Sequence, residues 1–341
     1  MMQKQILALL LALLSLVAGC DSSLSARTDT PSLIRIGASY WPGQYWADIA
    51  NHKGWFKEAG LNVQMVDTNA DYFASFDQVV DGKLDIVAFT LFDLTLYRAR
   101  GKALTGFMAS DYSSGADVLV ARNGIHTVRD LQGKKLGLTQ GTYVAYIWSV
   151  LAGRHDLKAG KVQIVEVSGE KASEALSSGR VDAVFTWEPF AQEAVTSVKG
   201  NRLFDTSQIP GISWAIYSAR NDFLRQRPAD VHLLMQVWQR TEDFIRKQPA
   251  QAYAIVAEVN HKTVAEVMAF ARLDKTLNPS ENRAAFSYAS GFDSLHGSVR
   301  RMNDFQIESG LTSIQVDTPS MLDSRFVDDL TRRAASADHV R

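Results

Sequence analysis

Acidic and aromatic side chains stand at the points where predicted strands of this sequence end. Glu188 lies between Trp187 and Pro189 in apolar company, where an unpaired carboxylate is costly, so it needs a cation, a hydrogen-bond donor or a proton. Open α/β sheets bind small molecules beyond the carboxyl ends of their strands. The candidate ligand-binding residues at such positions are Tyr40, Trp41, Asp71, Thr90, Asp111, Thr142, Tyr143, Trp187 and Glu188.

Several of these positions also have a purely structural interpretation. Thr90 and Asp93 form a Thr-x-x-Asp capping box, which favours Asp93 as a helix cap over a ligand contact. Thr142 fits equally well as a simple helix N-cap or as part of an anion site at a helix N-terminus. Trp41 and Trp187 could lie in the core, but their position in turns beside Pro and Gly favours the walls of a binding cleft.

Motifs for catalysis and for metal binding are absent from the sequence. Cys20 is the only cysteine, and none of the seven histidines has the i, i+4 spacing of zinc enzymes. Gly133-Lys134 lacks the preceding glycine of a phosphate loop, because Val128 stands at that position, and no Gly-x-Ser-x-Gly elbow occurs. We therefore expect no catalytic residue, no metal and no cofactor.

The N-terminus resembles a bacterial lipoprotein signal. Lys4 precedes an apolar stretch over 6–17, which is shorter than the roughly 20 residues of a membrane-spanning helix, and the run 16–20 ends in Cys20. The resemblance implies that residues 1–19 are removed, that Cys20 carries a lipid, and that Asp21 retains the protein at the periplasmic face of the inner membrane. An ordinary secretory signal with an incidental cysteine is the alternative.

The composition bounds the class of protein and its partners. The chain has 341 residues, 46% hydrophobic and 21% charged, which is typical of a soluble globular protein long enough for two domains. With Cys20 used by the anchor, no thiol remains for disulfides or cysteine nucleophiles. The formal net charge is −1 and no long block of like charge occurs, so nucleic acid is not an expected partner.

Strand and helix patterns alternate in the first two thirds of the chain. Polar residues over 20–32 read as a flexible linker, and the folded part is expected to begin near Leu33. Strands are predicted over 33–37, 62–66, 135–138 and 161–167, and helices over 46–59 and 143–152, which argues for parallel sheets. From Pro228 the pattern becomes helical, with helices predicted over 228–246, 249–258, 263–273 and 281–295 that pack around the first lobe.

A weak internal repeat accompanies this alternation. The segment 81–88, with Gly82 and Asp85, recurs in type as 178–185, with Gly179 and Asp182. In both, a helix ends at a glycine, a basic residue follows, and aspartate begins a short apolar strand. Two similar α/β lobes would explain the repeat, and a βα unit repeated inside one domain is the alternative.

Five motifs in order resemble the nitrate/sulfonate/taurine-type substrate-binding proteins of ABC importers, from about Leu33 to Phe326. They are Trp41-Pro42-Gly43, the run 54–61 (GWFKEAGL), the run 82–85 (GKLD), the run 131–137 (LQGKKLG) and the run 182–189 (DAVFTWEP).

The resemblance implies an α/β, two-lobed periplasmic-binding-protein fold of type II, in which each lobe is a mixed, mostly parallel sheet flanked by helices. Lobe 1 would comprise 33–110 and 211–330, including a helical C-terminal part, lobe 2 would comprise 111–210, and 331–341 would be a tail. The ligand would be trapped between the lobes by closure around a hinge.

The resemblance also implies partners and roles for individual residues. A monomer would deliver a small molecule to a permease of the inner membrane with a cytoplasmic ATPase. Glu188 would face a ligand amine, and Gly141-Thr142-Tyr143 would face an anionic end.

The candidate carboxylates Asp71, Asp111 and Glu188, with no arginine in these loops, favour a neutral or cationic nitrogen-containing ligand over nitrate or sulfate. Two other classes stay open. One is a sensor that presents its ligand to a membrane receptor, and the other is an enzyme of pyrimidine-precursor type, whose cysteine-rich stretch and histidine are missing here.

Overall fold

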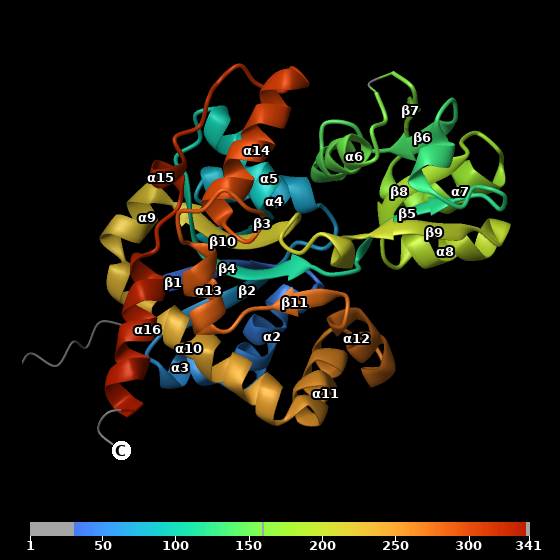
Figure 1. Ribbon diagram of the computed structural model, residues 1–341. Helices are drawn as coiled ribbons and strands as arrows, with labels where there is room; N and C mark the ends of the chain where they lie inside the picture. Colours follow the sequence, from blue (N-terminus) through green and yellow to red (C-terminus); the bar gives the residue numbers. More distant parts are fainter. Residues whose placement is uncertain (1–30, 159, 339–341) are drawn as a thin grey trace, which may run out of the picture. The chain divides into compact units, whose positions relative to one another are not determined.

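Two mixed β-sheets organise the chain in the computed structural model, which describes residues 31–158 and 160–338 (Figure 1). The first sheet has the strand order β11-β4-β10-β3-β1-β2 and the second has the order β7-β6-β8-β5-β9. The strands of the first sheet are β1 (Leu33–Ala38), β2 (Asn62–Asp67), β3 (Ile86–Thr90), β4 (Leu104–Ser113), β10 (Trp214–Arg220) and β11 (Asp274–Thr276). Those of the second are β5 (Asp117–Ala121), β6 (Lys135–Leu138), β7 (Gln163–Glu166), β8 (Ala183–Trp187) and β9 (Asn201–Asp205).

Both sheets share one topology. In the first, β1 pairs in parallel with β2 and β3, and β10 runs antiparallel to β3 and β4. In the second, β6 pairs in parallel with β7 and β8, and β5 runs antiparallel to β8 and β9. The orders β2-β1-β3-β10-β4 and β7-β6-β8-β5-β9 therefore correspond strand for strand, which confirms the predicted α/β class with two mixed sheets. The exact lobe boundaries stay predictions.

Helices connect the parallel strands and cover the sheets (Figure 1). The α-helices are α2 (Tyr45–His52), α3 (Trp55–Glu58), α4 (Tyr72–Val80), α5 (Leu91–Ala99), α6 (Tyr143–Arg154), α7 (Ala172–Ser177), α8 (Phe190–Val198), α9 (Asn221–Gln226), α10 (Pro228–Lys247), α11 (Pro249–Val259), α12 (Val264–Ala271), α13 (Pro279–Ala285), α14 (Leu295–Glu308), α15 (Thr318–Met321) and α16 (Arg325–Asp338). Short 3-10 turns are η1 (Pro42–Gln44), η2 (Val128–Leu131), η3 (Gly169–Lys171) and η4 (Thr206–Gln208). The C-terminal helices contact the first sheet and its helices, as predicted: α10 packs on α2, α14 on α5, and α13 and α16 on β4.

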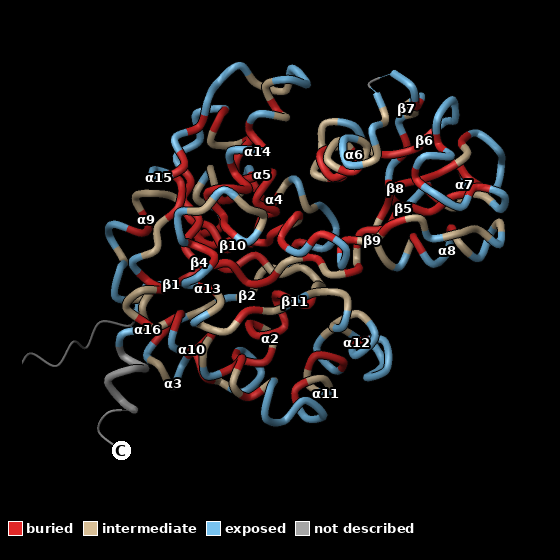
Figure 2. The backbone as a smooth tube through the Cα atoms, in the orientation of Figure 1, coloured by how far each residue is buried: buried red, intermediate tan, exposed pale blue. Residues whose placement is uncertain are grey.

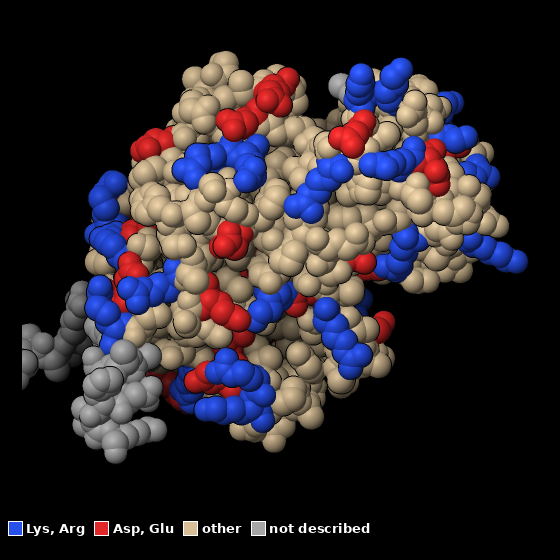
Figure 3. All heavy atoms as spheres, viewed as in Figure 1, with Lys and Arg blue, Asp and Glu red and all other residues tan. Residues whose placement is uncertain are grey.

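The hydrophobic core follows the central strands. Buried residues concentrate along the strands of both sheets (Figure 2), and β3 is buried at every position, as expected for a strand with neighbours on both sides and helices on both faces. Phe76 of α4 stacks on Phe89 of β3 with ring centres 4.1 Å apart. On the face shown in Figure 3, basic and acidic side chains are interspersed.

Two predicted helices differ from the observed ones, and the strands β4, β5, β9, β10 and β11 were not predicted. The helix predicted over 46–59 is divided into α2 and α3, because Gly54 adopts a φ of +72° that ends the first helix. The helix predicted over 281–295 is wrong: α13 ends at Ala285, and Ser294 begins α14 by accepting from the amide of Gly297. The strand β11, only three residues long, had no signal in the sequence.

Cys20, the predicted lipid-bearing residue, lies outside the described residues together with the predicted signal 1–19. Among the helices of the described part, none has the length and hydropathy needed to cross a membrane.

The internal repeat has a physical basis in the backbone. Asp85 accepts from the amide of Arg35 at 2.8 Å, and Asp182 accepts from the amide of Lys135 at 2.9 Å. The amide of Asp85 in turn donates to the carbonyl of Arg35, and the amide of Asp182 donates to the carbonyl of Lys135, at 2.9 Å in both cases. The glycines that precede them have φ values of +76° at Gly82 and +77° at Gly179. The same pair of hydrogen bonds thus fixes where β3 begins to pair with β1 and where β8 begins to pair with β6.

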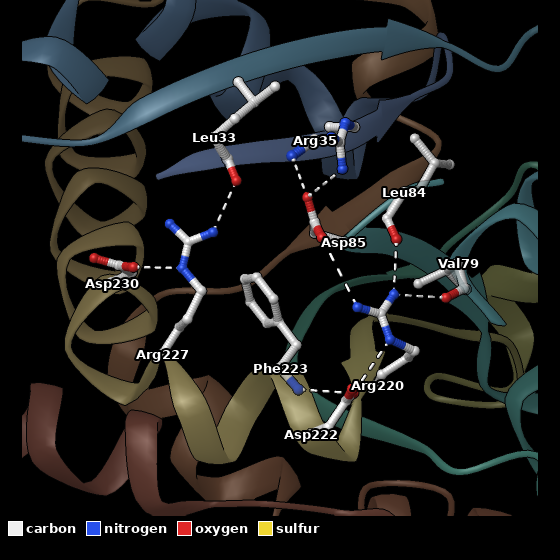
Figure 4. A network of polar contacts seen from close by, with 10 residues as sticks. All are labelled: Leu33, Arg35, Val79, Leu84, Asp85, Arg220, Asp222, Phe223, Arg227 and Asp230. Carbon is white, nitrogen blue, oxygen red and sulfur yellow. Dashed lines mark hydrogen bonds and ion pairs between the residues drawn. The ribbon is translucent and has the colours of Figure 1, made fainter. Parts of the chain in front are cut away.

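In the first sheet this aspartate is also the centre of an ion network (Figure 4). The carboxylate of Asp85 lies 3.6 Å from the Arg35 guanidinium and 4.0 Å from that of Arg220. Arg220 in turn donates to the carbonyl oxygens of Val79 and Leu84, at 3.0 and 3.2 Å. The network therefore ties β1 and β10 to the turn that precedes β3.

Asp85→Ala is expected to lower the free energy of unfolding by about 2–4 kcal/mol, because it leaves a buried amide and a half-buried guanidinium without their acceptor. Urea unfolding measures the change. Asp81→Ala is the matched control, since the ion pair of Asp81 with Lys83 is exposed on both sides and should contribute under about 0.5 kcal/mol. Equal losses in the two variants would contradict the network's role.

Candidate functional site

Asp111 lies at the centre of a buried group at the end of β4. It is only 1% exposed, and it accepts from Ser110 Oγ at 2.5 Å and from Trp41 Nε1 at 3.1 and 3.3 Å. Gly43 permits this arrangement, because a Cβ there would lie 1.8 Å from the Asp111 carboxylate. Trp41 is half-buried, and its indole N–H holds this carboxylate at the start of η1.

Thr90 and Asp71 are helix caps, as the Thr-x-x-Asp motif predicted for Thr90 but as no signal had indicated for Asp71. Thr90 Oγ1 accepts from the Asp93 amide at 3.1 Å and donates to Asp93 Oδ2 at 2.6 Å. The Tyr72 hydroxyl also donates to Asp93 Oδ2, at 3.0 Å, and itself accepts from the Thr90 amide. The Asp93 carboxylate therefore accepts from two hydroxyl groups and not from the Thr90 amide, so the predicted capping box is only half formed. Asp71 is exposed and caps α4 through the Ala74 amide.

Tyr143 and Thr142 begin α6 at the end of the second sheet. The Thr142 hydroxyl donates back to the Thr139 carbonyl at 2.7 Å, so its side chain does not cap the helix. The Tyr143 hydroxyl donates to Asp117 Oδ1 at 3.0 Å, and Asp117 is 4% exposed. The N-terminus of α6 therefore has no side-chain cap and stands beside a buried carboxyl group.

Trp187 ends β8 and Glu188 follows it, and the two side chains contact different partners. Trp187 is the cross-strand neighbour of Asp117, and its ring covers Gly169, where a Cβ would lie 2.4 Å from the ring. Glu188 Oε1 pairs with Arg202 of β9 at 2.5 Å, and Glu188 Oε2 accepts from the Gln192 amide at 3.0 Å. The cation and the donor that the sequence required for Glu188 are thus supplied by the protein itself.

Tyr40 joins an aromatic group next to the buried end of β4. Its ring centre lies 5.7 Å from that of Tyr45 and 5.5 Å from that of Phe270. Its backbone amide donates to Asn69 Oδ1 at 2.6 Å, which fixes the loop after β1 to the loop after β2. The loops that follow two parallel neighbours are therefore tied together at one edge of the sheet.

Burial of carboxyl groups is the common electrostatic feature of these positions. It raises the pKa of Asp93, Asp111 and Asp117 to about 6 in each case. Burial, followed by the charges of Asp111 and Asp117, raises the pKa of Asp274 well above its ordinary value. Asp274 was missed from the sequence, because only the pairing of the three-residue strand β11 with β4 brings it to this place.

The structure brings most, but not all, of the predicted residues together. Burial, Asp117, and then Tyr72 and Asp93 raise the pKa of Tyr143, so groups of the two sheets act on one another there. Trp187 lies beside this set as the cross-strand neighbour of Asp117, and Asp274, which the register of β11 places diagonally from Asp111, is within electrostatic range of both aspartates. In the described ranges no hydrogen bond or ion pair joins the side chains of Asp71 or Glu188 to it, and their ligand roles stay predictions. No three His, Cys, Asp or Glu side chains of the described part are arranged to hold a metal ion.

The buried carboxyl groups predict a pH dependence of stability. In the folded chain Asp93 holds its proton up to about pH 6, whereas in the unfolded chain it is released around its ordinary pKa of 3.8. The folded state binds more protons between these limits, so the free energy of unfolding falls as pH rises through them. Asp93→Asn cannot titrate, and its Tm should fall less than that of the unaltered protein between pH 5 and pH 7.5.

Burial lowers the pKa of His296, so this residue makes the stability rise with pH, opposite to the effect of Asp93. His296 is present in both proteins, so its contribution cancels in the comparison. An equal or steeper fall in the variant would contradict the raised pKa of Asp93.

The Glu188–Arg202 pair is expected to be a structural contact. Because Arg202 is more than a third exposed, a double-mutant cycle of Glu188→Gln and Arg202→Gln should give a coupling of only about 1 kcal/mol in urea unfolding. Additive losses would show that the pair contributes nothing to stability and would leave Glu188 available to other partners.

Comparison with known proteins places this arrangement in a family. A family profile described as "NMT1/THI5 like" matches residues 47–252. A putative aliphatic sulfonates-binding protein of Bacillus subtilis (strain 168) is 24% identical over 340 residues, which is 95% of this chain and 96% of that protein.

Solved structures share the fold. The periplasmic aliphatic sulphonate binding protein SsuA of Escherichia coli superposes with a TM-score of 0.70 at 17% identity, over 86% of this chain and 92% of that one. The desulfurization enzyme DSZB superposes with a TM-score of 0.61 at 14% identity, over 89% and 99% of the two chains. The fold thus serves binding proteins and at least one enzyme, and the predicted resemblance is confirmed: this chain belongs to the NMT1/THI5-like family and has the periplasmic-binding-protein fold.

Proposed function

We propose that the chain is the extracytoplasmic substrate-binding component of an ABC importer, and that it is not an enzyme. It would bind a small organic ligand at the carboxyl ends of its parallel strands and deliver it to an inner-membrane permease with a cytoplasmic ATPase. Family membership supports this function, as does similarity to a sulfonate-binding protein over nearly the whole chain. The observation that carries it is the hydrogen-bonded pair of Tyr143 and Asp117 on the side of the second sheet, within electrostatic range of the bonded pair of Tyr72 and Asp93 on the side of the first.

The proposed ligand is a small nitrogen-containing molecule, neutral or cationic. Asp93, Asp111 and Asp117 are buried at the candidate site, and in the described ranges none of them forms an ion pair with Lys, Arg or His. A ligand that donates hydrogen bonds or carries positive charge is attracted by such groups, whereas an anion is repelled in their low-dielectric surroundings.

A sulfonate-bearing ligand is the second candidate, because the relatives named above are described as sulfonate-binding proteins. The N-terminus of α6, whose amides receive no cap from Thr142, is a place that suits an anionic group. A zwitterion would satisfy both features.

The lipid anchor at Cys20, the position at the periplasmic face of the inner membrane and the monomeric state are part of the proposal. The relatives that support it include a protein described as periplasmic.

A thermal-shift screen of the purified protein with amines, amides, ureas, pyrimidines, sulfonates and nitrate tests the function. At about 100 times the dissociation constant a ligand adds roughly 2.7 kcal/mol, a shift of several degrees for a chain of this size. A shift with one class would support a binding protein and identify its cargo. A turnover assay with each stabilising compound provides the control, and product formation would contradict the non-enzymatic role.

A further inference from the structure

We propose that Asp111, Asp117 and Asp274 form a subsite for an organic cation, so that the ligand carries an amine, amidine or guanidinium group. This inference rests on the proposed function and names the chemical class of its ligand.

The register of three strands places these carboxyl groups together. In the antiparallel pair of β4 and β11, Asp274 lies opposite Ser113, and Thr276 lies opposite Asp111. Asp274 and Asp111 are therefore diagonal neighbours on one face of the first sheet, within reach of one another's charge. Asp117 begins β5, a few residues after Ser113, where the chain passes to the second sheet. The charge of Asp274 is accordingly opposed by both Asp111 and Asp117.

These three groups lack a counter-charge within the described chain. Asp111 accepts only from the neutral donors Ser110 and Trp41, and Asp117 accepts from the neutral hydroxyl of Tyr143. In residues 31–158 and 160–338 the Asp274 side chain makes no hydrogen bond or ion pair. Like charges held together out of water are costly, and a bound cation is the partner that would offset that cost.

An unpartnered donor supports a ligand at this place independently of the carboxyl groups. Tyr45 is 2% exposed, and its hydroxyl has no hydrogen-bond partner in the described structure. Burial, an interaction with the neighbouring Tyr40 hydroxyl that falls short of hydrogen-bond geometry, and then the charge of Asp274 raise its pKa, so the Asp274 carboxyl lies within electrostatic range of this hydroxyl. Buried hydroxyls are normally satisfied, so Tyr45 is expected to bond a group that the ligand brings.

Aromatic rings at both ends of the subsite suit a cation. Trp187 is the cross-strand neighbour of Asp117, and Tyr40 lies beside Tyr45. The face of an aromatic ring attracts organic cations, and the Nζ of Lys262 already lies 5.6 Å from the centre of the Tyr40 ring. Lys262 makes no ion pair with the three carboxyl groups in the described structure, so it does not neutralise them.

A metal ion fits this place less well than an organic cation does. Metal sites need ligands that converge on one point at short distances, and no such group exists in the described residues. An amidine or a guanidinium spreads its charge and its donors over several atoms, and can therefore reach carboxyl groups that lie on three different strands.

The test uses the purified protein at pH 8 with guanidinium, n-propylammonium, agmatine and, as the anionic counterpart, propane-1-sulfonate. Calorimetric titration and thermal shift are expected to show binding of at least one cation and none of the sulfonate. Asp274→Asn should weaken binding of that cation by tenfold or more, while the unliganded variant is as stable as the unaltered protein or more so, because a half-buried charge opposed by Asp111 and Asp117 has been removed. Asp304→Asn, which removes an exposed acidic group of α14, should change neither property.

The outcomes separate the two proposals. Binding of propane-1-sulfonate with no cation bound would overturn the subsite and leave the substrate-binding function standing. Unchanged cation affinity in Asp274→Asn, or a loss of unliganded stability in that variant, would also overturn the subsite. Silence with all four probes would overturn the subsite, while the substrate-binding function would be decided by the wider thermal-shift screen described above.

Discussion

Parallel pairing of the central strands is the constraint on which this molecule depends. Parallel neighbours cannot be joined by a tight turn, so a helix must intervene between them, and all such strands end at one edge of their sheet. The helices α4, α5 and α6 therefore begin at these edges, and the residues that start them, Asp71, Thr90 and Thr142, stand there too. The chemistry available at the candidate site follows from which side chains precede each helix.

The two sheets solve the problem of strand register in the same way. A side chain that accepts from a backbone amide of the neighbouring strand fixes the offset of a parallel pair, and Asp85 and Asp182 both do this, through Arg35 and Lys135. A shift of one residue would turn every side chain of the strand to the opposite face. The first sheet adds the guanidinium groups of Arg35 and Arg220 around its aspartate. The similarity of the two lobes is thus a repeated contact as well as a repeated strand order.

Local patterns predicted most of the fold, and contacts between distant segments account for what was missed. The strands over 33–37, 62–66 and 135–138, the helix from Tyr143 and the repeat around Asp85 depend on neighbours in sequence, so periodicity and turn glycines indicate them. The pairing of Glu188 with Arg202 connects two strand ends that only the folded sheet brings together. Asp274 reaches its place through three residues of β11, too few for any periodicity.

Glu188 and the three aspartates Asp111, Asp117 and Asp274 have opposite consequences for ligand binding. Glu188 is compensated by Arg202, so its charge is balanced within the second sheet and adds little to the potential that a ligand meets. Asp111, Asp117 and Asp274 have only neutral partners or none in the described structure, and the burial of the first two and the half-burial of Asp274 make each further negative charge more costly. Side chains at strand ends can change without disturbing the pairing beneath them, so one fold can accept ligands of opposite charge. The balance between the acids around the end of β4 and the uncapped N-terminus of α6, rather than the fold, would therefore decide which ligand charge this chain accepts.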